Sequence, residues 1–363
     1  MTINEGVQFY LLVFGMLFFV CIQKPNAVVL YFLFWVLLAF ASVNIELSVD
    51  YPGYIAYFNC SVVDSCSDLL SKRVESSYIY ISRLISVLGG DGYFAVFFYI
   101  CVSIFIKVLV IGKSSHFGIA LFAYVAFGFF VHEMTQVRVG LAIAFIWLAV
   151  LFSARRRMVI SLLTMAAAFV LHNSSIVAIL HFILKEFSLN KYAVVVLFVM
   201  AALFGYLIAG TSWLSYLDLS DPRFATYLAA DPDSLVSTPQ FTVNVTIYMV
   251  SILLAYYLRG GLKYDRFSEA SLNLSVFGVL IYLAFYWVPV VGLRVMELFT
   301  SFMPFVIAAA YKRSNSNYIK IIFILLVFGI FINFFVRNIS PFSEENEPVP
   351  FDVSQSRVLN FYG

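Results

Sequence analysis

The chain has 363 residues, of which 63% are hydrophobic and 12% are charged, and its formal net charge is +2. Soluble globular domains are about half apolar and about a quarter charged, so this composition excludes an ordinary soluble domain. The basic residues form short groups between apolar blocks and not one basic face, so the charge does not indicate nucleic-acid binding.

The apolar blocks are long enough for helices that cross a hydrocarbon layer of about 30 Å. In chain order they predict spans near residues 6–23, 27–44, 92–112, 117–131, 138–152, 192–210, 241–258, 272–291, 295–311 and 319–336. The first block has no basic residue before it and no small-residue cleavage site after it, so we expect a retained helix and not a signal peptide.

The stretch 158–187 suits either one long tilted helix or two short helices that turn at His172-Asn173-Ser174-Ser175. Lys and Arg in short loops mark the cytoplasmic side, and only two short helices place every basic group there. These groups are Lys24, Lys107 with Lys113, Arg155-Arg156-Arg157, Lys185 with Lys191, Arg259 with Lys263 and Arg266, and Lys312-Arg313 with Lys320. The sequence therefore predicts an all-α polytopic protein with about twelve crossings, including a broken helix pair, and with both termini outside.

This topology gives a single transmembrane domain over residues 1–340, with outer loops at 45–90 and 211–240 and an outer tail at 341–363. Within the first loop, residues 76–88 have the pattern of an amphipathic helix that lies at the membrane interface. The same loop holds Cys60 and Cys66. The sequence is compatible both with a disulfide between them and with two free thiols.

Motif searches exclude several classes of site. The chain has no Walker loop, no nucleotide-binding Gly-rich turn, no His-Glu-x-x-His and no Cys-x-x-Cys pair. Asp231-Pro232-Asp233 is more typical of a turn than of a Mg²⁺ site. We therefore expect neither a nucleotide nor a metal cofactor.

Ionisable residues near or within membrane spans are costly and often functional. On the predicted topology the candidates share the outer half of the protein, and they are Asp50, Glu75, Arg83, His132, Glu133, Arg138, His172, Arg223, Arg294 and Glu297. Arg138 opens a helix, where the positive dipole end would help it hold an anion, although a lone arginine there can also anchor to headgroups. Gly140 and Ala142 would let a neighbouring helix or a substrate approach closely.

Two further candidates each have a structural alternative. Arg294 and Glu297 lie three residues apart and face the same way, so they can pair with each other or contact a substrate. His172 sits at the predicted helix break, where a neutral imidazole can accept a proton from a hydroxyl or simply form structural hydrogen bonds.

At these residues the chain resembles the EpsG-like branch of Wzy-type O-antigen and exopolysaccharide polymerases. The shared motifs, in order, are Asp50-Tyr51 with Tyr54, Glu75 with Tyr78, Arg138-Val139-Gly140-Leu141-Ala142, His172-Asn173-Ser174-Ser175, Arg223 with Tyr227, and Arg294 with Glu297. The chain departs from the family at Val139, where a polar residue is expected. The resemblance implies a fold similar to membrane-embedded GT-C glycosyltransferases, placed in a bacterial inner membrane with the active site facing the periplasm.

The resemblance also implies an activity, the transfer of a growing glycan from undecaprenyl diphosphate onto the next lipid-linked repeat unit. The expected partners are the lipid-linked oligosaccharide donor and acceptor, membrane lipid, a chain-length regulator and a flippase. We expect catalytic roles for His172, Arg138, Arg294 and Glu75, and substrate binding by Asp50, Tyr54, Tyr78, Arg83, His132, Gln136, Arg223, Tyr227 and Glu297. A flippase or transporter for the same lipid and an O-antigen ligase or acyltransferase are the alternative functions.

Overall fold

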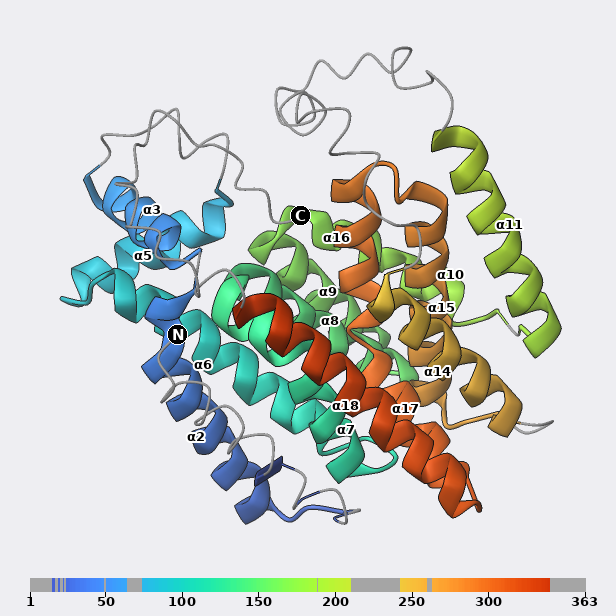
Figure 1. Cartoon of the computed structure of the whole chain (residues 1–363). Helices are drawn as coiled ribbons and strands as arrows, with labels where there is room; N and C mark the ends of the chain where they lie inside the picture. The colour runs from blue at the N-terminus through green and yellow to red at the C-terminus, as the bar shows by residue number, and fades with distance from the viewer. Residues whose placement is uncertain are drawn as a thin grey trace.

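The computed structural model describes residues 15–16, 19, 22, 24–48, 50–63, 74–187, 189–209, 242–259 and 263–339. These residues form a bundle of helices, and no β-strand occurs among them (Figure 1). The helices are α2 (Ala27–Asn44), η2 (Ile45–Leu47), α3 (Tyr51–Val63), α5 (Ser76–Val87), α6 (Gly92–Ile111), α7 (Phe117–Tyr124), η3 (Val125–Thr135), α8 (Val137–Ala154), α9 (Met158–Leu171), η4 (Asn173–Leu180), α10 (His181–Leu184), α11 (Lys191–Ala209), α14 (Val243–Arg259), α15 (Arg266–Phe285), α16 (Pro289–Thr300), α17 (Met303–Arg313) and α18 (Asn317–Ile339).

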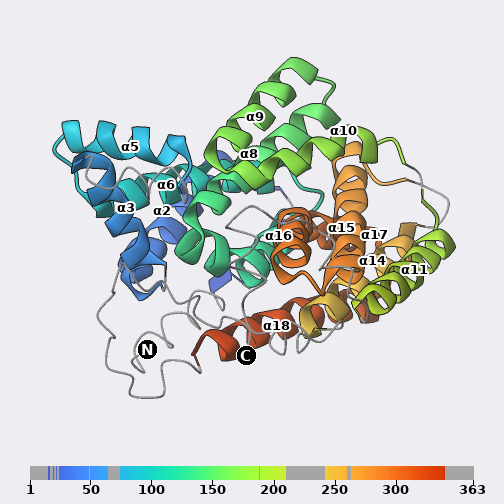
Figure 2. The ribbon, with the colours of Figure 1, turned by 90° about the horizontal axis from the view of Figure 1, so that it is seen from above.

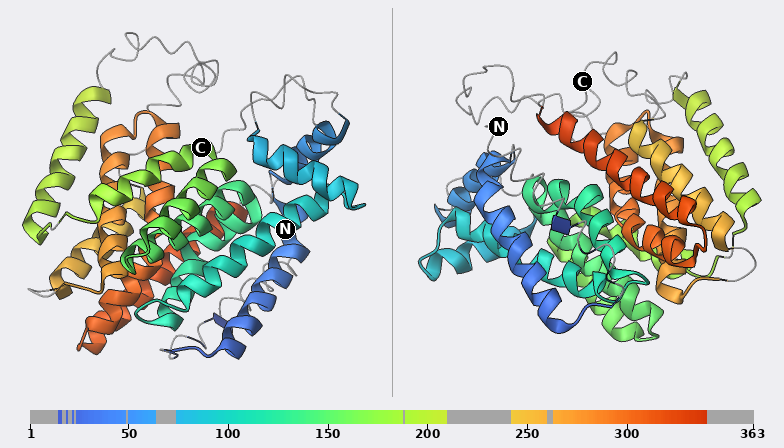
Figure 3. Two further views of the ribbon diagram at one scale, coloured as in Figure 1. Left: turned by 180° about the vertical axis from the view of Figure 1, so that it is seen from behind. Right: turned by 60° about the horizontal axis from the view of Figure 1, so that its bottom comes forward.

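Helix α8 lies at the centre of the bundle and packs against α6 and α9. Seen from above, α2, α3, α5 and α6 lie on one side, and α11, α14 and α15 lie on the other (Figure 2). Helices α2 and α11 stand at opposite edges in the other views as well (Figure 3). On the core side of α8, the Trp147 ring meets Phe305 of α17 edge-on, with ring centroids 4.7 Å apart.

Within the described part of the chain, six helices are long and apolar enough to cross a membrane, namely α2, α6, α7 continued by η3, α8, α11 and α15. The bent pair α16 and α17 adds a seventh if it counts as one span, and α9, η4 with α10, α14 and α18 are shorter apolar helices. The all-helical membrane class is confirmed. The predicted twelve crossings and the GT-C-like fold are not confirmed, and most of the predicted span 6–23 lies outside the described residues.

Side-chain caps fix where several helices begin. Asn26 Oδ1 accepts a hydrogen bond from Val29 N at 2.9 Å before α2, and Asp91 caps α6 in the same way. Asp265 Oδ1 accepts from both Phe267 N and Ser268 N at 3.1 Å before α15. Each cap satisfies backbone N–H groups that the first turn of a helix leaves without partners.

The predicted turn at His172 is confirmed. His172 has extended dihedral angles between α9 and the 3₁₀ helix η4, so the helix breaks there. The chain then returns to the end where α9 began, since Lys185 Nζ lies 3.5 Å from Ser153 Oγ and 3.9 Å from Met158 Sδ. The segment is therefore a helical hairpin and not one long helix.

Residues 45–90, predicted to be an outer loop with one helix, contain two helices that pack against each other. Helix α5 matches the predicted amphipathic segment, because Tyr78 is fully buried and Tyr80 is 69% exposed. Helix α3 was not expected. Cys60, on α3, is in a disulfide, and residue 66 lies outside the described residues.

Two segments depart from regular α-helix where the sequence predicts regular spans or a short turn. The predicted turn after residue 131 is instead the end of η3, an 11-residue π-helix. The predicted span 295–311 is broken at Ser301–Phe302, where the helix axis bends by 43°. π-Helical segments and helix breaks occur preferentially at functional sites and cavities, so η3 and the break between α16 and α17 are candidate parts of a functional site.

The prediction that Lys107 belongs to a cytoplasmic basic group with Lys113 is wrong. Lys107 is fully buried and forms an ion pair with Glu133, which is also fully buried. Tyr124 Oη donates to the same carboxylate at 2.9 Å, and the Lys107 ammonium lies over the rings of Tyr124 and Trp147. Burying a charge is tolerated only with such a partner, and the pair ties α6 to η3.

Candidate functional site

Three of the predicted site residues meet at one carboxylate. Glu75 accepts hydrogen bonds from the Arg138 guanidinium and from His172, whose Nδ1 lies 2.7 Å from Glu75 Oε1. All three side chains are mostly buried, with exposed fractions of 10%, 16% and 20% for Glu75, Arg138 and His172. We call this group the Glu75 cluster.

The cluster is assembled from three helix ends that are distant in sequence. Glu75 is the N-cap residue of α5, Arg138 lies in the first turn of α8, and His172 is the C-cap residue of α9. Helix α8 begins at the cluster and ends at Ala154, next to the basic residues 155–157. The cluster therefore lies at the end of the bundle opposite to that basic turn.

Tyrosine rings surround the Arg138 guanidinium. Its central carbon lies 5.5, 5.8 and 5.9 Å from the ring centroids of Tyr54, Tyr57 and Tyr78. Tyr78 Oη donates to the backbone oxygen of Tyr54 at 2.9 Å, and its ring lies 5.6 Å from that of Tyr99. Cations are attracted to aromatic faces, so this cage fixes the guanidinium. Its Nε is buried and makes no hydrogen bond with any residue that the structure describes.

The electrostatics of the cluster favour an ionised Glu75. Burial acts to raise the pKa of Glu75, but the hydrogen bond with His172 and the positive charge of Arg138 outweigh it, so the pKa is lowered. Asp50 behaves in the opposite way. Its pKa is raised, because burial outweighs the opposing charges of Arg294 and Arg138.

Arg294 is thus close enough to influence Asp50 together with Arg138, although it is not part of the Glu75 cluster. On α16, Arg294 Nη1 lies 3.8 Å from Glu297 Oε2, a weak ion pair beyond hydrogen-bond distance. The sequence hypothesis that these two residues face the same way is confirmed. Whether they also contact a substrate stays a prediction.

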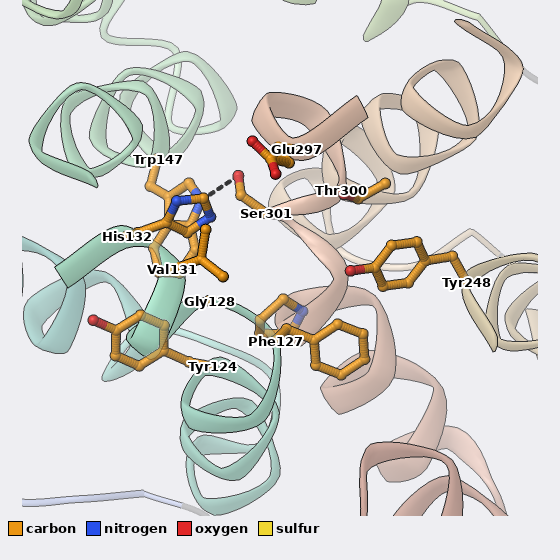
Figure 4. A pocket seen from close by; sticks show the side chains of 11 residues that line it. Tyr124, Phe127, Gly128, Val131, His132, Trp147, Tyr248, Glu297, Thr300 and Ser301 are labelled. Carbon is orange, nitrogen blue, oxygen red and sulfur yellow. Dashed lines mark hydrogen bonds between the residues drawn. The ribbon is translucent and has the colours of Figure 1, made fainter. Parts of the chain in front are cut away.

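His132 and Glu297 line a small cavity between η3 and the bend of α16 and α17 (Figure 4). The backbone of His132 is packed directly against Gly140, where a Cβ would lie 2.1 Å from His132 O. The close approach predicted at Gly140 is therefore made by a neighbouring backbone. Gln136 lies in the connection between His132 and Arg138, and its side-chain oxygen is buried.

Other predicted site residues are placed elsewhere or not at all. Arg83 Nε donates to Ser61 O at 2.9 Å, which ties α5 to α3. Arg223 and Tyr227 lie outside the described residues. Among the residues that the structure does describe, no three His, Cys, Asp or Glu side chains come together as a candidate metal site.

Sequence reasoning missed Tyr57 and Tyr99, which complete the aromatic surroundings of Arg138. Tyr57 could have been found from its spacing, because it lies three residues after Tyr54 and so shares a helix face with it. Tyr99 lies within an apolar run of α6 and gives no comparable signal.

Comparison with known proteins identifies the family of the chain. The model of the EpsG family matches residues 27–351, a segment that includes Glu75, Arg138, His172, Arg294 and Glu297. No individual curated protein and no solved structure matches the chain. Because the match covers most of its length, the chain belongs to the EpsG family.

Proposed function

We propose that this protein is a polysaccharide polymerase, a membrane glycosyltransferase that moves a growing glycan from undecaprenyl diphosphate onto the next lipid-linked repeat unit at the outer face of a bacterial inner membrane. The observation that carries the proposal is the Glu75 cluster, in which a caged arginine and a histidine share one carboxylate. Membership of the EpsG family supports the same class of reaction.

The donor needs a partner for its departing diphosphate. Guanidinium groups bind phosphate oxygens through paired N–H donors, and the Arg138 guanidinium is held in place by tyrosine rings while its side chain keeps 16% of its surface exposed. Arg294 lies near Asp50 at the side of the cluster and is the second candidate for this negative charge. Positive charge arranged in advance stabilises charge that develops on a leaving group.

The acceptor needs a base. Glu75 binds the Nδ1 side of His172, which leaves Nε2 to take the proton from the acceptor hydroxyl. In this step the bond between the acceptor oxygen and the sugar C1 forms, the bond from C1 to the diphosphate oxygen breaks, and the diphosphate leaves with its electron pair. Glu75, bound to both Arg138 and His172, serves to orient the base and stabilise its protonated form.

The end of the bundle used by the cluster also supports an outer site. The cluster lies opposite to the basic turn at 155–157, and basic turns mark the cytoplasmic side. Sugar units carried on a lipid diphosphate are already activated, so an outer site needs no nucleotide.

The test is gel analysis of surface polysaccharide from a strain that lacks this gene. We expect single capped units in place of a chain-length ladder. Absence of all surface glycan would instead indicate a flippase, and intact polymer on the wrong carrier would indicate a ligase.

Complementation then tests the site. Arg138→Lys and Arg294→Lys keep the charge but lose the planar donor pair, so polymer length should collapse while single-unit capping persists. Arg157→Lys, an exposed arginine at the opposite end, is the matched control and should restore the full ladder. Normal ladders from the Arg138→Lys and Arg294→Lys strains would contradict the assignment.

A further inference from the structure

The cavity lined by His132 and Glu297 lies between the two irregular helical segments of the fold. It has a volume of about 40 Å³ and lies between the π-helix η3 and the bend that separates α16 from α17. Non-helical or distorted backbone at membrane depth is stable where it lines a cavity. The coincidence of both distortions at one cavity indicates that the fold builds this space and does not merely leave it unfilled.

His132 lines the cavity from η3. Its side chain is 5% exposed, and its buried Nδ1 has no hydrogen-bond partner within the part of the chain that the structure describes. Opposite it, the Glu297 carboxylate faces the same space from α16 (Figure 4). A buried ring nitrogen without a partner is unfavourable, so this arrangement favours a ligand that supplies the missing hydrogen bond.

The His132 ring is held in this position by its neighbours. Glu133, the next residue, is fixed by the buried Lys107 ammonium and by Tyr124 Oη. On the other side, the backbone of His132 lies against Gly140. The backbone that carries the His132 ring is therefore fixed on both sides.

The remaining walls combine aromatic faces with hydroxyl groups. The rings of Phe127 and Tyr248 are stacked with centroids 5.4 Å apart, and Trp147 forms part of the opposite wall. Ser301 is already occupied, since its Oγ accepts from Trp147 Nε1 and donates to Leu298 O. Aromatic faces with a few polar groups fixed in position suit a carbohydrate, whose C–H faces are apolar and whose hydroxyls donate and accept.

The cavity is large enough to admit a polar group of a ligand. About 40 Å³ exceeds the roughly 10–15 Å³ that one water molecule needs, so the cavity has room for more than a single water. A single hydroxyl or hydroxymethyl group fits. Arg294 lies 3.8 Å from Glu297, which lines the cavity, and acts electrostatically on both His132 and Asp50. Asp50 is also influenced by Arg138, so the cavity is linked to the charged groups of the Glu75 cluster through Arg294 and Asp50.

We propose that this cavity is the acceptor subsite, in which the His132 imidazole and Glu297 bind a hydroxyl or hydroxymethyl group at the non-reducing end of the incoming glycan. This inference rests on the proposed function and assigns the acceptor end to a place separate from the Arg138 group that would hold the donor diphosphate. The aromatic walls then contact the terminal sugar at the mouth of the cavity.

The test separates donor from acceptor with the full-length protein in liposomes. The donor is the lipid-diphosphate-linked repeat unit extracted from polymerase-deficient cells, and the acceptor is a fluorescent glycoside of the same unit, which has no diphosphate and can only accept. In His132→Gln and Glu297→Gln we expect the KM for the glycoside to rise at least tenfold while the KM for the donor changes less than twofold. His116→Gln, a buried histidine that caps α7, is the control and should change neither KM.

Equilibrium binding of the fluorescent glycoside, followed by its anisotropy, keeps the test independent of transfer. Weaker binding in His132→Gln, by at least tenfold, supports the subsite even if the protein proves not to polymerise. Unchanged acceptor KM and unchanged binding in both variants would overturn the subsite while leaving the polymerase assignment intact. If one variant fails to fold in detergent, as judged by size-exclusion chromatography, the other carries the test.

Discussion

Replacing Glu75 by glutamine tests the central cluster most directly. The amide keeps the size of the side chain and can still accept one hydrogen bond, but it loses the negative charge that holds Arg138 and His172 together. The change should therefore leave the fold largely intact and damage the chemistry.

The expected loss can be worked from the contacts. A hydrogen bond to a charged group contributes about 1.5–3 kcal/mol, and each 1.36 kcal/mol corresponds to about tenfold in rate. Losing the charge that stabilises protonated His172 should then reduce transfer about 10- to 150-fold, which overlaps the roughly 10²- to 10⁴-fold expected from a general base. Because the effect falls on the transition state, kcat should fall more than KM rises.

The assay is transfer of the lipid-linked repeat unit by purified protein in liposomes. Glu46→Gln is the matched control, since Glu46 is an exposed glutamate at the end of α2 and should leave the rate unchanged. A Glu75→Gln enzyme that keeps more than a third of the wild-type rate would refute the role of the shared carboxylate.

Three further predictions concern stability. Because the pKa of Glu75 is lowered in the folded protein, its charge stabilises the fold at pH values above the ordinary carboxyl pKa of about 4.3. This stabilisation is lost as the pH falls through the pKa of the folded state. The unfolding midpoints of wild type and Glu75→Gln in detergent should therefore converge between pH 7 and pH 3. Gly140→Ala places a Cβ 2.1 Å from His132 O and should cost about 1–3 kcal/mol, measured as a lower unfolding midpoint. Lys107→Met alone leaves Glu133 buried and unpaired and should cost about 3–5 kcal/mol, whereas the double variant Lys107→Met with Glu133→Leu should regain most of this in the same assay.

Each of these has its own control. Gly53→Ala adds a Cβ where nothing lies within 4 Å, so it should not lower the midpoint, and an equal loss in both glycine variants would contradict the contact at Gly140. A constant difference between wild type and Glu75→Gln across the pH range would argue against the lowered pKa. A double Lys107 and Glu133 variant no more stable than the single one would show that the pair is not the source of the loss.

The sequence predicts a single site that contains His172, Arg138, Arg294 and Glu75. The structure brings His172, Arg138 and Glu75 together and leaves Arg294 outside their cluster, and it contains the predicted turn at His172. That turn was predictable because the basic residues on either side had to share one face, and because Asn173 and Ser174 follow the histidine. The requirement that the basic groups lie on one side of the membrane thus predicted the turn, which local helix propensity alone does not predict.

Other features depend on packing between distant segments and have no local pattern. The partner of Lys107 lies 26 residues away, and the π-helical form of η3 follows from the contacts that fix Glu133 and Gly140. The break before α17 did have a signal, since Pro304 stands in the first turn of that helix, where proline is tolerated and mid-helix proline is not. Because Pro304 stands within a long apolar run, the sequence nevertheless predicts one continuous span there.

The length of α9 in the hairpin of α9 and η4 determines how far below the membrane surface His172 lies. Helix α9 has 14 residues, so it rises only about 21 Å at 1.5 Å per residue, whereas the hydrocarbon layer is about 30 Å thick. If its basic start is anchored at one headgroup layer, its tip ends about 9 Å short of the other. Under the proposed function, a lipid diphosphate therefore has to descend from the headgroup plane to reach His172, which requires a water-filled path down to that imidazole.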